Sequence, residues 1–237
     1  MTKKEAEVYE ATGLEELFSE LPEEEVLSLV TPSNRKVTIR PLTFEDEKII
    51  AKSQKRGADT GTTALLERCV TGEDIPSLLL IDKLYLILKI REISFGNEYK
   101  ITLICNNCNV ENDLAIELNK LEVKNLPVPD NLTLSLPILK KECIFRRAEI
   151  SDEIYLKNED TLFSNLWRFI KKLGKIEDQA LISAAINRIP IADIHLIIKS
   201  INSTAYGLQT KVKYACNSCS TDQQVTLPIT EDFFSVS

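Results

Sequence analysis

The sequence predicts an α+β protein made of two related halves, each a set of helices followed by a β-hairpin that carries a Cys-x-x-Cys pair. The segments 100–108 and 211–219 both read as an alternating run that ends in Cys-x-x-Cys, and a second alternating run follows each pair. Alternation of apolar and polar residues is typical of strands, so each pair is expected at the tip of a hairpin. Apolar segments predicted to be helical, 82–89 and 193–199, precede the two hairpins.

The length of 237 residues allows one large domain or two small ones. Hydrophobic residues make up 43% of the chain, which is enough for a buried core. The N-terminus has no apolar stretch of the kind that a signal peptide requires. The most apolar segment, 75–90, carries Asp82, Lys83 and Lys89 and is too short and too charged to span a membrane. We therefore expect a soluble, intracellular protein in which this segment forms a buried helix.

Residues 1–34 form a predicted acidic, partly flexible arm. Residues 1–30 contain nine Glu and two Lys, while acidic and basic residues balance from Thr31 onward. This arm is either a solvated terminus or a segment that docks on a basic partner through apolar residues at helical spacing, namely Leu14, Leu17, Phe18 and Leu21. A neutral body with an acidic arm is poorly suited to bind the phosphate backbone of nucleic acids.

The predicted first half covers residues 35–120 and carries the cysteine knuckle 105–108. After a short strand, the segment 43–46 reads Thr-Phe-Glu-Asp, which indicates a helix start because Thr caps the first turn and an acid follows three residues later. Gly57 is expected to end the first helix, and Gly96 is a plausible C-cap of the last one. Helices are predicted at about 44–52, 62–69 and 77–93.

The predicted second half covers residues 121–237, carries the knuckle 216–219 and follows the Pro-containing stretch 126–130. Gly174 is expected to end its second helix, and Pro190 its third. Helices are predicted near 151–156, 160–173, 176–188 and 191–202. Aromatic residues on the second helix are expected in the core rather than in a ligand site: Phe163, Trp167 and Phe169.

Four matches in the same order indicate that the two halves are related and form one compact unit. Besides the cysteine pairs, the residues before each hairpin, the apolar helices and an earlier strand-turn segment recur at comparable places. The matched pairs are 37–47 with 143–153, 82–89 with 193–199, 95–96 with 206–207, and 105–108 with 216–219.

Two hairpin tips that face each other supply four thiolates, the ligand set of a tetrahedral structural Zn²⁺ site. The residue after each knuckle usually has a positive φ, which suits Asn109 better than Ser220. Bringing the tips together across a flexible loop costs about 4 kcal/mol. Structural zinc in finger peptides contributes roughly 10–16 kcal/mol, so zinc binding outweighs the cost of closing the loop. The predicted ligands are Cys105, Cys108, Cys216 and Cys219.

Other uses of these cysteines stay open. Iron in a rubredoxin-like site takes the same ligands and is the less favoured metal. A thioredoxin-like redox pair requires its first cysteine at a helix N-terminus, whereas a strand pattern follows each pair here. A third alternative is that the thiols are reduced and hold no metal. Cys69 and Cys143 lie alone in apolar surroundings and are expected to be small core residues.

The sequence indicates no catalytic machinery, and we expect a non-enzymatic protein. The single histidine, His195, sits on an apolar helix and is expected to be a core or edge residue. No Gly-rich phosphate loop, nucleophile elbow or His-Glu zinc motif occurs. A small basic patch lacks interleaved aromatic residues: Arg168, Lys171, Lys172 and Lys175. Two rival classes stay open, a zinc-ribbon nucleic-acid-binding accessory factor and a redox or metal-handling enzyme.

The segments 37–47 and 84–96, together with both Cys-x-x-Cys hairpins, resemble the baseplate hub assembly proteins of T-even-like tailed phages. The resemblance covers about residues 35–234, including the closing Asp232-Phe-Phe234. It implies the same order of strand, helices, knuckle, middle region and second knuckle. It also implies the function of a non-enzymatic hub component or assembly chaperone that acts in contractile-tail morphogenesis through protein–protein contacts.

The resemblance further implies that other phage baseplate hub proteins are the partners and that the four knuckle cysteines are the paired-cysteine positions of the family. It places the protein in the host cytoplasm during assembly, with the virion baseplate as a second location. The chain departs from the family at its acidic arm, where members often have a short Pro/Gly motif, and at Ser220. Neither nucleic acid nor a membrane is expected as a partner, and the oligomeric state is left undefined.

Overall fold

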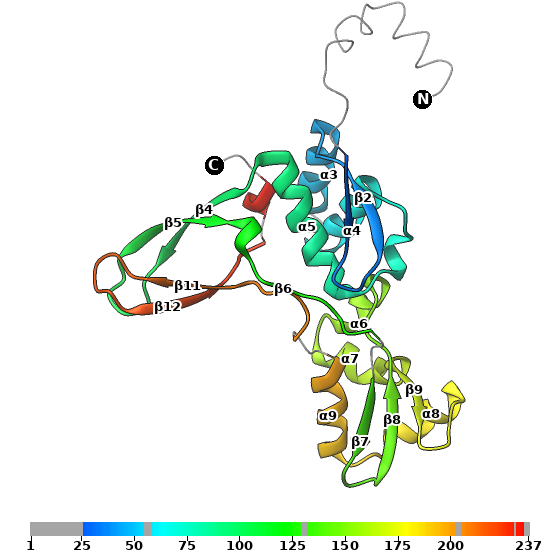
Figure 1. The fold of residues 1–237 in the computed structure, drawn as a ribbon. Coiled ribbons are helices and arrows are strands. Elements are labelled where there is room, and N and C mark those ends of the chain that lie inside the picture. Colours follow the sequence, from blue (N-terminus) through cyan, green and yellow to red (C-terminus); the bar gives the residue numbers. More distant parts are fainter. Residues whose placement is uncertain (1–25, 55–57, 129–131, 202–204, 230, 235–237) are drawn as a thin grey trace, which may run out of the picture.

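The chain folds into two helix-and-sheet lobes and a pair of β-hairpins that project from the first lobe (Figure 1). This computed structural model describes residues 26–54, 58–128, 132–201, 205–229 and 231–234. Residues 1–25 lie outside that description, including the apolar positions predicted to dock on a basic partner, and so does Gly57. The mixed α+β fold class with its small antiparallel sheets is as predicted.

The first lobe packs three helices against a small antiparallel sheet. Its strands pair in the order β1-β2-β3. The long helix α5 supplies much of the core, with Leu86, Leu88 and Ile90 all at most 1% exposed. Gly96 ends this helix at φ 87°, with its N–H donated to the Glu92 carbonyl, as predicted for a C-cap. The elements are β1 (Leu27–Val30), β2 (Lys36–Ile39), α3 (Phe44–Gln54), α4 (Ala58–Cys69), β3 (Val70–Thr71), the 3-10 helix η1 (Ile75–Ser77) and α5 (Leu80–Phe95).

The second lobe repeats this plan with shorter helices and its own core. Its antiparallel sheet has the order β7-β8-β9, and the fully buried Phe169 lies in the core cluster beneath it. The elements are β7 (Thr133–Leu136), β8 (Lys141–Phe145), η3 (Ile150–Asp152), α6 (Glu153–Leu156), α7 (Glu159–Asn165), η4 (Leu166–Phe169), β9 (Ile170–Leu173), α8 (Gln179–Ile186) and α9 (Ile191–Ile201).

The prediction of a helix over residues 160–173 is wrong for the second part of that segment. The α-helix ends at Asn165, a 3-10 turn follows, and residues 170–173 form β9, which pairs with β8. Apolar residues at helical spacing in this segment also suit a turn and a strand, and only the partner strand decides between them. Gly174, at φ 59°, therefore ends a strand and not a helix. Phe163 is 49% exposed, so its expected place in the core is also wrong.

The two hairpins carry the cysteine knuckles and lie side by side (Figure 1). Inward-facing residues of both hairpins, among them Tyr99, Ile116 and Leu227, belong to the core cluster of the first lobe. The chain then returns to that lobe, where Phe233 packs edge-to-face on Tyr99 with ring centroids 4.9 Å apart. The elements are β4 (Glu98–Ile104), β5 (Glu111–Glu117), η2 (Leu118–Lys120), β6 (Val123–Lys124), β10 (Gly207–Leu208), β11 (Lys211–Ala215), β12 (Asp222–Thr226) and η5 (Glu231–Phe234).

The same local contact closes the strand–helix turn in both lobes. In the first lobe, Nη1 of Arg40 donates to Oδ2 of Asp46 at 2.7 Å, and that oxygen also accepts the Thr43 N–H at 2.9 Å. In the second lobe, Nη1 of Arg146 donates to Oδ2 of Asp152 at 2.5 Å, and the same oxygen accepts the Glu149 N–H at 2.9 Å. Both carboxylates thus satisfy free N–H groups at a helix start.

A second contact recurs where each long helix meets the first turn of its sheet. Asp82 of α5 accepts the backbone N–H of Ser33 at 2.9 Å, and Asp193 of α9 accepts the backbone N–H of Leu139 at 2.7 Å. Both aspartates are fully buried. The strand β1, which pairs with β2, lies inside the segment 1–34 that the sequence assigned to the arm.

Gly207→Ala is expected to destabilise the protein by about 1–3 kcal/mol. Gly207 has φ +85°, and a Cβ there would lie 3.1 Å from the Ile81 carbonyl oxygen and 3.2 Å from its Cβ. Gly96→Ala is the matched control, because Gly96 has φ +87° but nothing within 4 Å of an added Cβ. Chemical denaturation of both variants measures the effect. If Gly207→Ala lowers the free energy of unfolding no more than Gly96→Ala does, the expected clash with Ile81 of α5 would be contradicted.

Candidate metal centre

The four knuckle cysteines meet at the tips of the two hairpins. The pair Cys105 and Cys108 lies between β4 and β5, and the pair Cys216 and Cys219 lies between β11 and β12. All four sulfur atoms lie within 4.8 Å of one another. Each cysteine pair lies in the turn between two paired strands, so each hairpin fixes the position of its own tip. The two tips project together from the first lobe (Figure 1).

The distances between sulfur atoms fit a tetrahedral site. Sγ of Cys105 lies 3.8 Å from Sγ of Cys219, and Sγ of Cys108 lies 3.6 Å from Sγ of Cys216. These separations are too long for disulfides, whose sulfur atoms lie about 2.05 Å apart. A tetrahedron with Zn–S bonds of about 2.3 Å places its sulfur atoms roughly 3.8 Å apart. The donor set therefore fits a thiophilic metal ion such as Zn²⁺ or iron.

Both knuckles have the same backbone geometry. In the first, the Asn109 N–H donates to the Cys105 carbonyl at 2.9 Å, and in the second the Ser220 N–H donates to the Cys216 carbonyl at 2.9 Å. Asn109 has φ 58° and Ser220 has φ 55°, so both residues adopt the left-handed conformation predicted for this position. Ser220 therefore adopts the left-handed conformation that this turn requires, although asparagine is the more favourable residue there.

Polar side chains that the sequence reasoning missed connect the two knuckles. Nδ2 of Asn107 lies 3.6 Å from Sγ of Cys219 and 3.2 Å from Oγ1 of Thr221. Asn112 is 1% exposed, and its Oδ1 accepts the Asn217 N–H of the other hairpin at 2.8 Å. The available signal was the abundance of Asn and Thr in and just after the knuckles, residues that donate to sulfur and close turns.

Cys219 and Cys108 differ in acidity. Hydrogen bonds with the side chain and backbone of Thr221 and the side chain of Asn107 lower the pKa of Cys219 to about 5. A hydrogen bond with the Val110 backbone lowers the pKa of Cys108, but burial and the three neighbouring sulfurs outweigh it and raise this pKa to about 12. Sulfur atoms this close repel one another once ionised, and a bound divalent cation would offset that repulsion.

Cys69 and Cys143 lie outside this cluster, as expected for small core residues. Cys69 is 1% exposed and Cys143 is fully buried, and burial raises the pKa of Cys143 to about 11. His195 lies on α9 and is exposed, so it occupies the edge and not the core. Among the described residues, no helix is both long and apolar enough to cross a membrane.

The fold and the site together define a mixed α+β protein whose two hairpins gather four cysteines into a possible metal centre. Residues 24–235 match the family model described as T4 bacteriophage base plate protein. The chain therefore belongs to this baseplate protein family, which agrees at family level with the resemblance found in the sequence. No curated protein and no solved structure matches the chain.

Proposed function

We propose that the protein is a hub component or assembly chaperone of the phage baseplate that acts in contractile-tail morphogenesis through contacts with other hub proteins, without enzymatic activity. The observation that carries this proposal is the match to the baseplate protein family over residues 24–235. The proposed place of action is the host cytoplasm during assembly, and the virion baseplate is the second location.

The proposed role of the four cysteines is to hold a structural Zn²⁺ ion. The sulfur separations of 3.6 and 3.8 Å support it, as do the hydrogen bonds with Cys219. A four-cysteine site has no open position for a substrate, which favours a structural rather than a catalytic ion. Zinc there would clamp hairpins that lie more than a hundred residues apart in sequence. Iron would give a coloured protein, so an absorption spectrum separates the two metals.

The rival classes find less support. The charged residues of the four hairpin strands are five acids and three lysines, an unfavourable surface for nucleic acid: Glu98, Lys100, Glu111, Asp113, Glu117, Lys211, Lys213 and Asp222. A strand, β5 or β12, follows each cysteine pair. A redox pair of the thioredoxin type uses a helix N-terminus at that place to stabilise its thiolate.

Thr221→Val is expected to weaken zinc binding about 10–100-fold, because hydrogen bonds with ligand atoms orient the ligand and stabilise its charged form. The Thr221 hydroxyl lies 3.3 Å from Sγ of Cys219. Competition with a chromogenic chelator measures the affinity. Thr226→Val is the matched control, since Thr226 lies on the same hairpin at its far end. Equal affinities of the two variants would show that the hydroxyl does not support the site.

Affinity purification of the tagged full-length protein from infected, nuclease-treated cells tests the proposed function. We expect co-purification of other baseplate proteins and one zinc per chain by elemental analysis. Recovery that depends on nucleic acid would favour the accessory-factor class, and recovery of no baseplate protein would contradict the hub role. Mass spectrometry of purified particles then distinguishes a hub component, which stays in the virion, from a chaperone, which leaves.

A further inference from the structure

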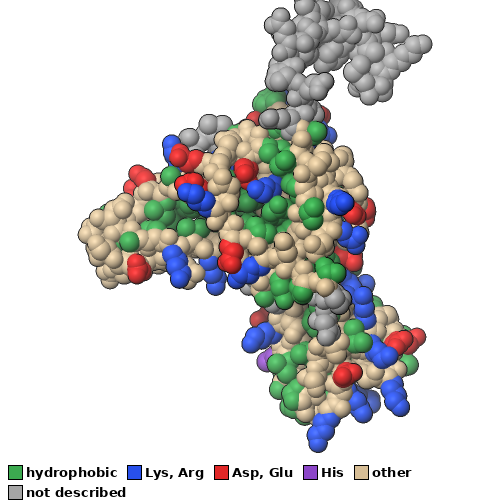
Figure 2. All heavy atoms as spheres, in the orientation of Figure 1, with side chains coloured by type: hydrophobic (Ala, Val, Ile, Leu, Met, Phe, Trp, Pro, Cys, Tyr) green, Lys and Arg blue, Asp and Glu red, His purple; other side chains and the backbone are tan. Residues whose placement is uncertain are grey.

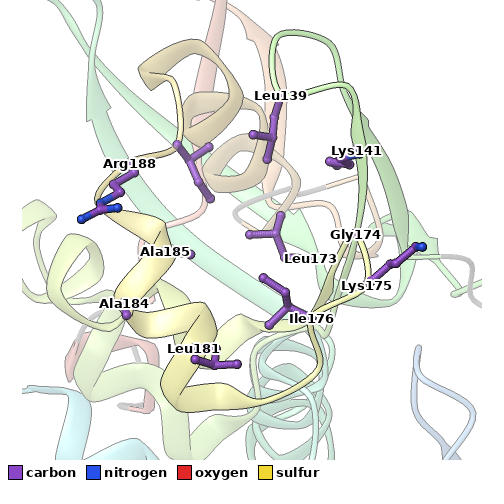
Figure 3. A pocket seen from close by; sticks show the side chains of 11 residues that line it. Leu139, Lys141, Leu173, Gly174, Lys175, Ile176, Leu181, Ala184, Ala185 and Arg188 are labelled. Carbon is purple, nitrogen blue, oxygen red and sulfur yellow. The ribbon is translucent and has the colours of Figure 1, made fainter.

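The second lobe carries an apolar groove between α8 and the β8–β9 side of the sheet. The groove has a volume of about 700 Å³. Leu139, Leu173 and Ile176 line its centre, and Leu181 of α8 borders it with 58% of its surface exposed (Figure 3). A surface of this kind on a protein in water commonly marks a contact with another chain.

Cations surround this groove, and its lining includes no acidic residue. Lys141, Lys175 and Arg188 contribute to the lining and are exposed, with Lys175 and Arg188 on opposite sides of the apolar centre (Figure 3). Within the described part of the chain, none of the three forms an ion pair, whereas the nearby Glu177 pairs with Lys172 at 2.5 Å. Lys and Arg side chains also outnumber Asp and Glu on the visible face of this lobe (Figure 2).

The groove is specific to the second lobe because an added segment builds it. In the first lobe, residues 72–79 connect β3 to α5. In the second lobe, residues 174–190 connect β9 to α9 and include α8. Most of the groove lining comes from this longer connection. The first lobe forms its sheet and helices without such a connection, so the longer connection is not needed for the fold that the lobes share. We therefore expect its exposed apolar surface to contact a partner.

We propose that the acidic segment 1–25 of a second copy of this chain docks in the groove. This segment contains all nine Glu of the first 30 residues and has apolar residues at helical spacing, Leu14, Leu17, Phe18 and Leu21. Its composition complements an apolar groove bordered by three cations: the apolar residues enter the groove and the carboxylates meet the Lys and Arg side chains.

The donor is a second copy because of where the segment is attached. Residue 26 leads into β1 in the first lobe, while α8 lies in the second lobe at the other end of the molecule (Figure 1). Four residues separate Leu21 from residue 26, and an extended chain spans at most about 3.6 Å per residue. Leu21 of a chain can therefore lie no more than about 18 Å from residue 26 of the same chain. Docking between copies is head-to-tail, since two different surfaces meet.

Sedimentation of the full-length chain at increasing concentration tests the proposal. We expect the wild type to self-associate, less so at high salt because screening weakens the charge contacts. Leu17→Asp/Phe18→Asp removes the apolar contacts of the segment, and Lys175→Glu/Arg188→Glu reverses the charge at the groove. Each double variant is expected to raise the dissociation constant at least about ten-fold, equivalent to 1.4 kcal/mol. Lys171→Glu, an exposed lysine of the same lobe outside the groove, is the control and is expected to change it less than two-fold.

A mixing experiment makes the assignment of the two surfaces specific. One double variant retains the groove and the other retains the segment. An equimolar mixture is therefore expected to form a one-to-one dimer at a concentration at which each variant alone is monomeric. A wild type that stays monomeric at all concentrations would overturn the proposal. So would a mixture that remains monomeric, or a groove variant that associates as tightly as Lys171→Glu.

Discussion

Cys216→Ser is expected to leave the purified protein without tightly bound zinc and to lower its free energy of unfolding by about 4 kcal/mol or more. The ion, if bound as proposed, joins residues 108 positions apart. A cross-link that closes a loop of about 100 residues removes roughly 4.7 kcal/mol of chain entropy from the unfolded state. Loss of the fourth ligand removes this cross-link, together with the binding energy of the metal.

Elemental analysis and thermal unfolding, each with and without chelator, measure this effect. For a chain of this size, 4 kcal/mol lowers the melting temperature by roughly 8–16 °C. Cys143→Ala is the matched control, because Cys143 is fully buried in the second-lobe core and far from the cluster. It is expected to lose some packing energy but to retain one zinc per chain. A Cys216→Ser protein with full zinc content would contradict the proposed ligand set, and identical melting with and without chelator would contradict the structural role.

Asp46→Asn is expected to destabilise the protein by about 3 kcal/mol, the lower end of the range for breaking a buried ion pair. The Asp46 side chain is fully buried, and its carboxylate accepts hydrogen bonds from Arg40 at 2.7 Å and Arg68 at 2.7 Å. The amide removes the negative charge that both guanidinium groups share, although Arg68 still pairs with Glu45 at 2.9 Å. The lower end applies because Arg40 and Arg68 retain 20% and 36% exposure, so water compensates part of the loss.

Glu45→Gln separates the effect of burial from the effect of charge. Glu45 pairs with the same Arg68 at 2.9 Å, but its side chain is 73% exposed. An exposed pair of this kind contributes about 0–1 kcal/mol. Urea denaturation of both variants at pH 7 compares them. A loss for Asp46→Asn as small as that for Glu45→Gln would contradict the importance of the turn contact shared by the two lobes.

The same carboxylate predicts how stability depends on pH. Burial raises the pKa of Asp46, but hydrogen bonds from Arg40, Arg68 and Thr43 outweigh it, so the folded-state pKa lies well below the ordinary 3.8. A depressed carboxyl pKa stabilises the folded state above the unfolded pKa, and this contribution is lost as the pH falls toward the folded pKa. Wild type is therefore expected to lose stability below about pH 4, and Asp46→Asn is expected to lose less over that range.

Prediction from the sequence succeeded where the signal is local. The first helix of the first lobe starts at Phe44, where the Asp46 carboxylate accepts the Thr43 N–H and the Thr43 carbonyl accepts the Asp46 N–H, a pattern visible in four consecutive residues. Both hairpins follow from alternation and from the turn that Cys-x-x-Cys requires. The strand β9 was missed because its apolar residues fit a helix equally well, and pairing with β8 is a long-range event.

The amino-acid sequence by itself determined the elements of this protein that need only neighbouring residues: the capped helices, the hairpins and the four cysteines at their tips. Tertiary structure alone decided that the second hairpin belongs to the core of the first lobe, where Leu227 and Phe233 pack. It also decided that the connection 174–190 builds a cation-bordered groove. The physical reason is that burial and charge contacts depend on residues distant in the chain, whose approach no local pattern encodes.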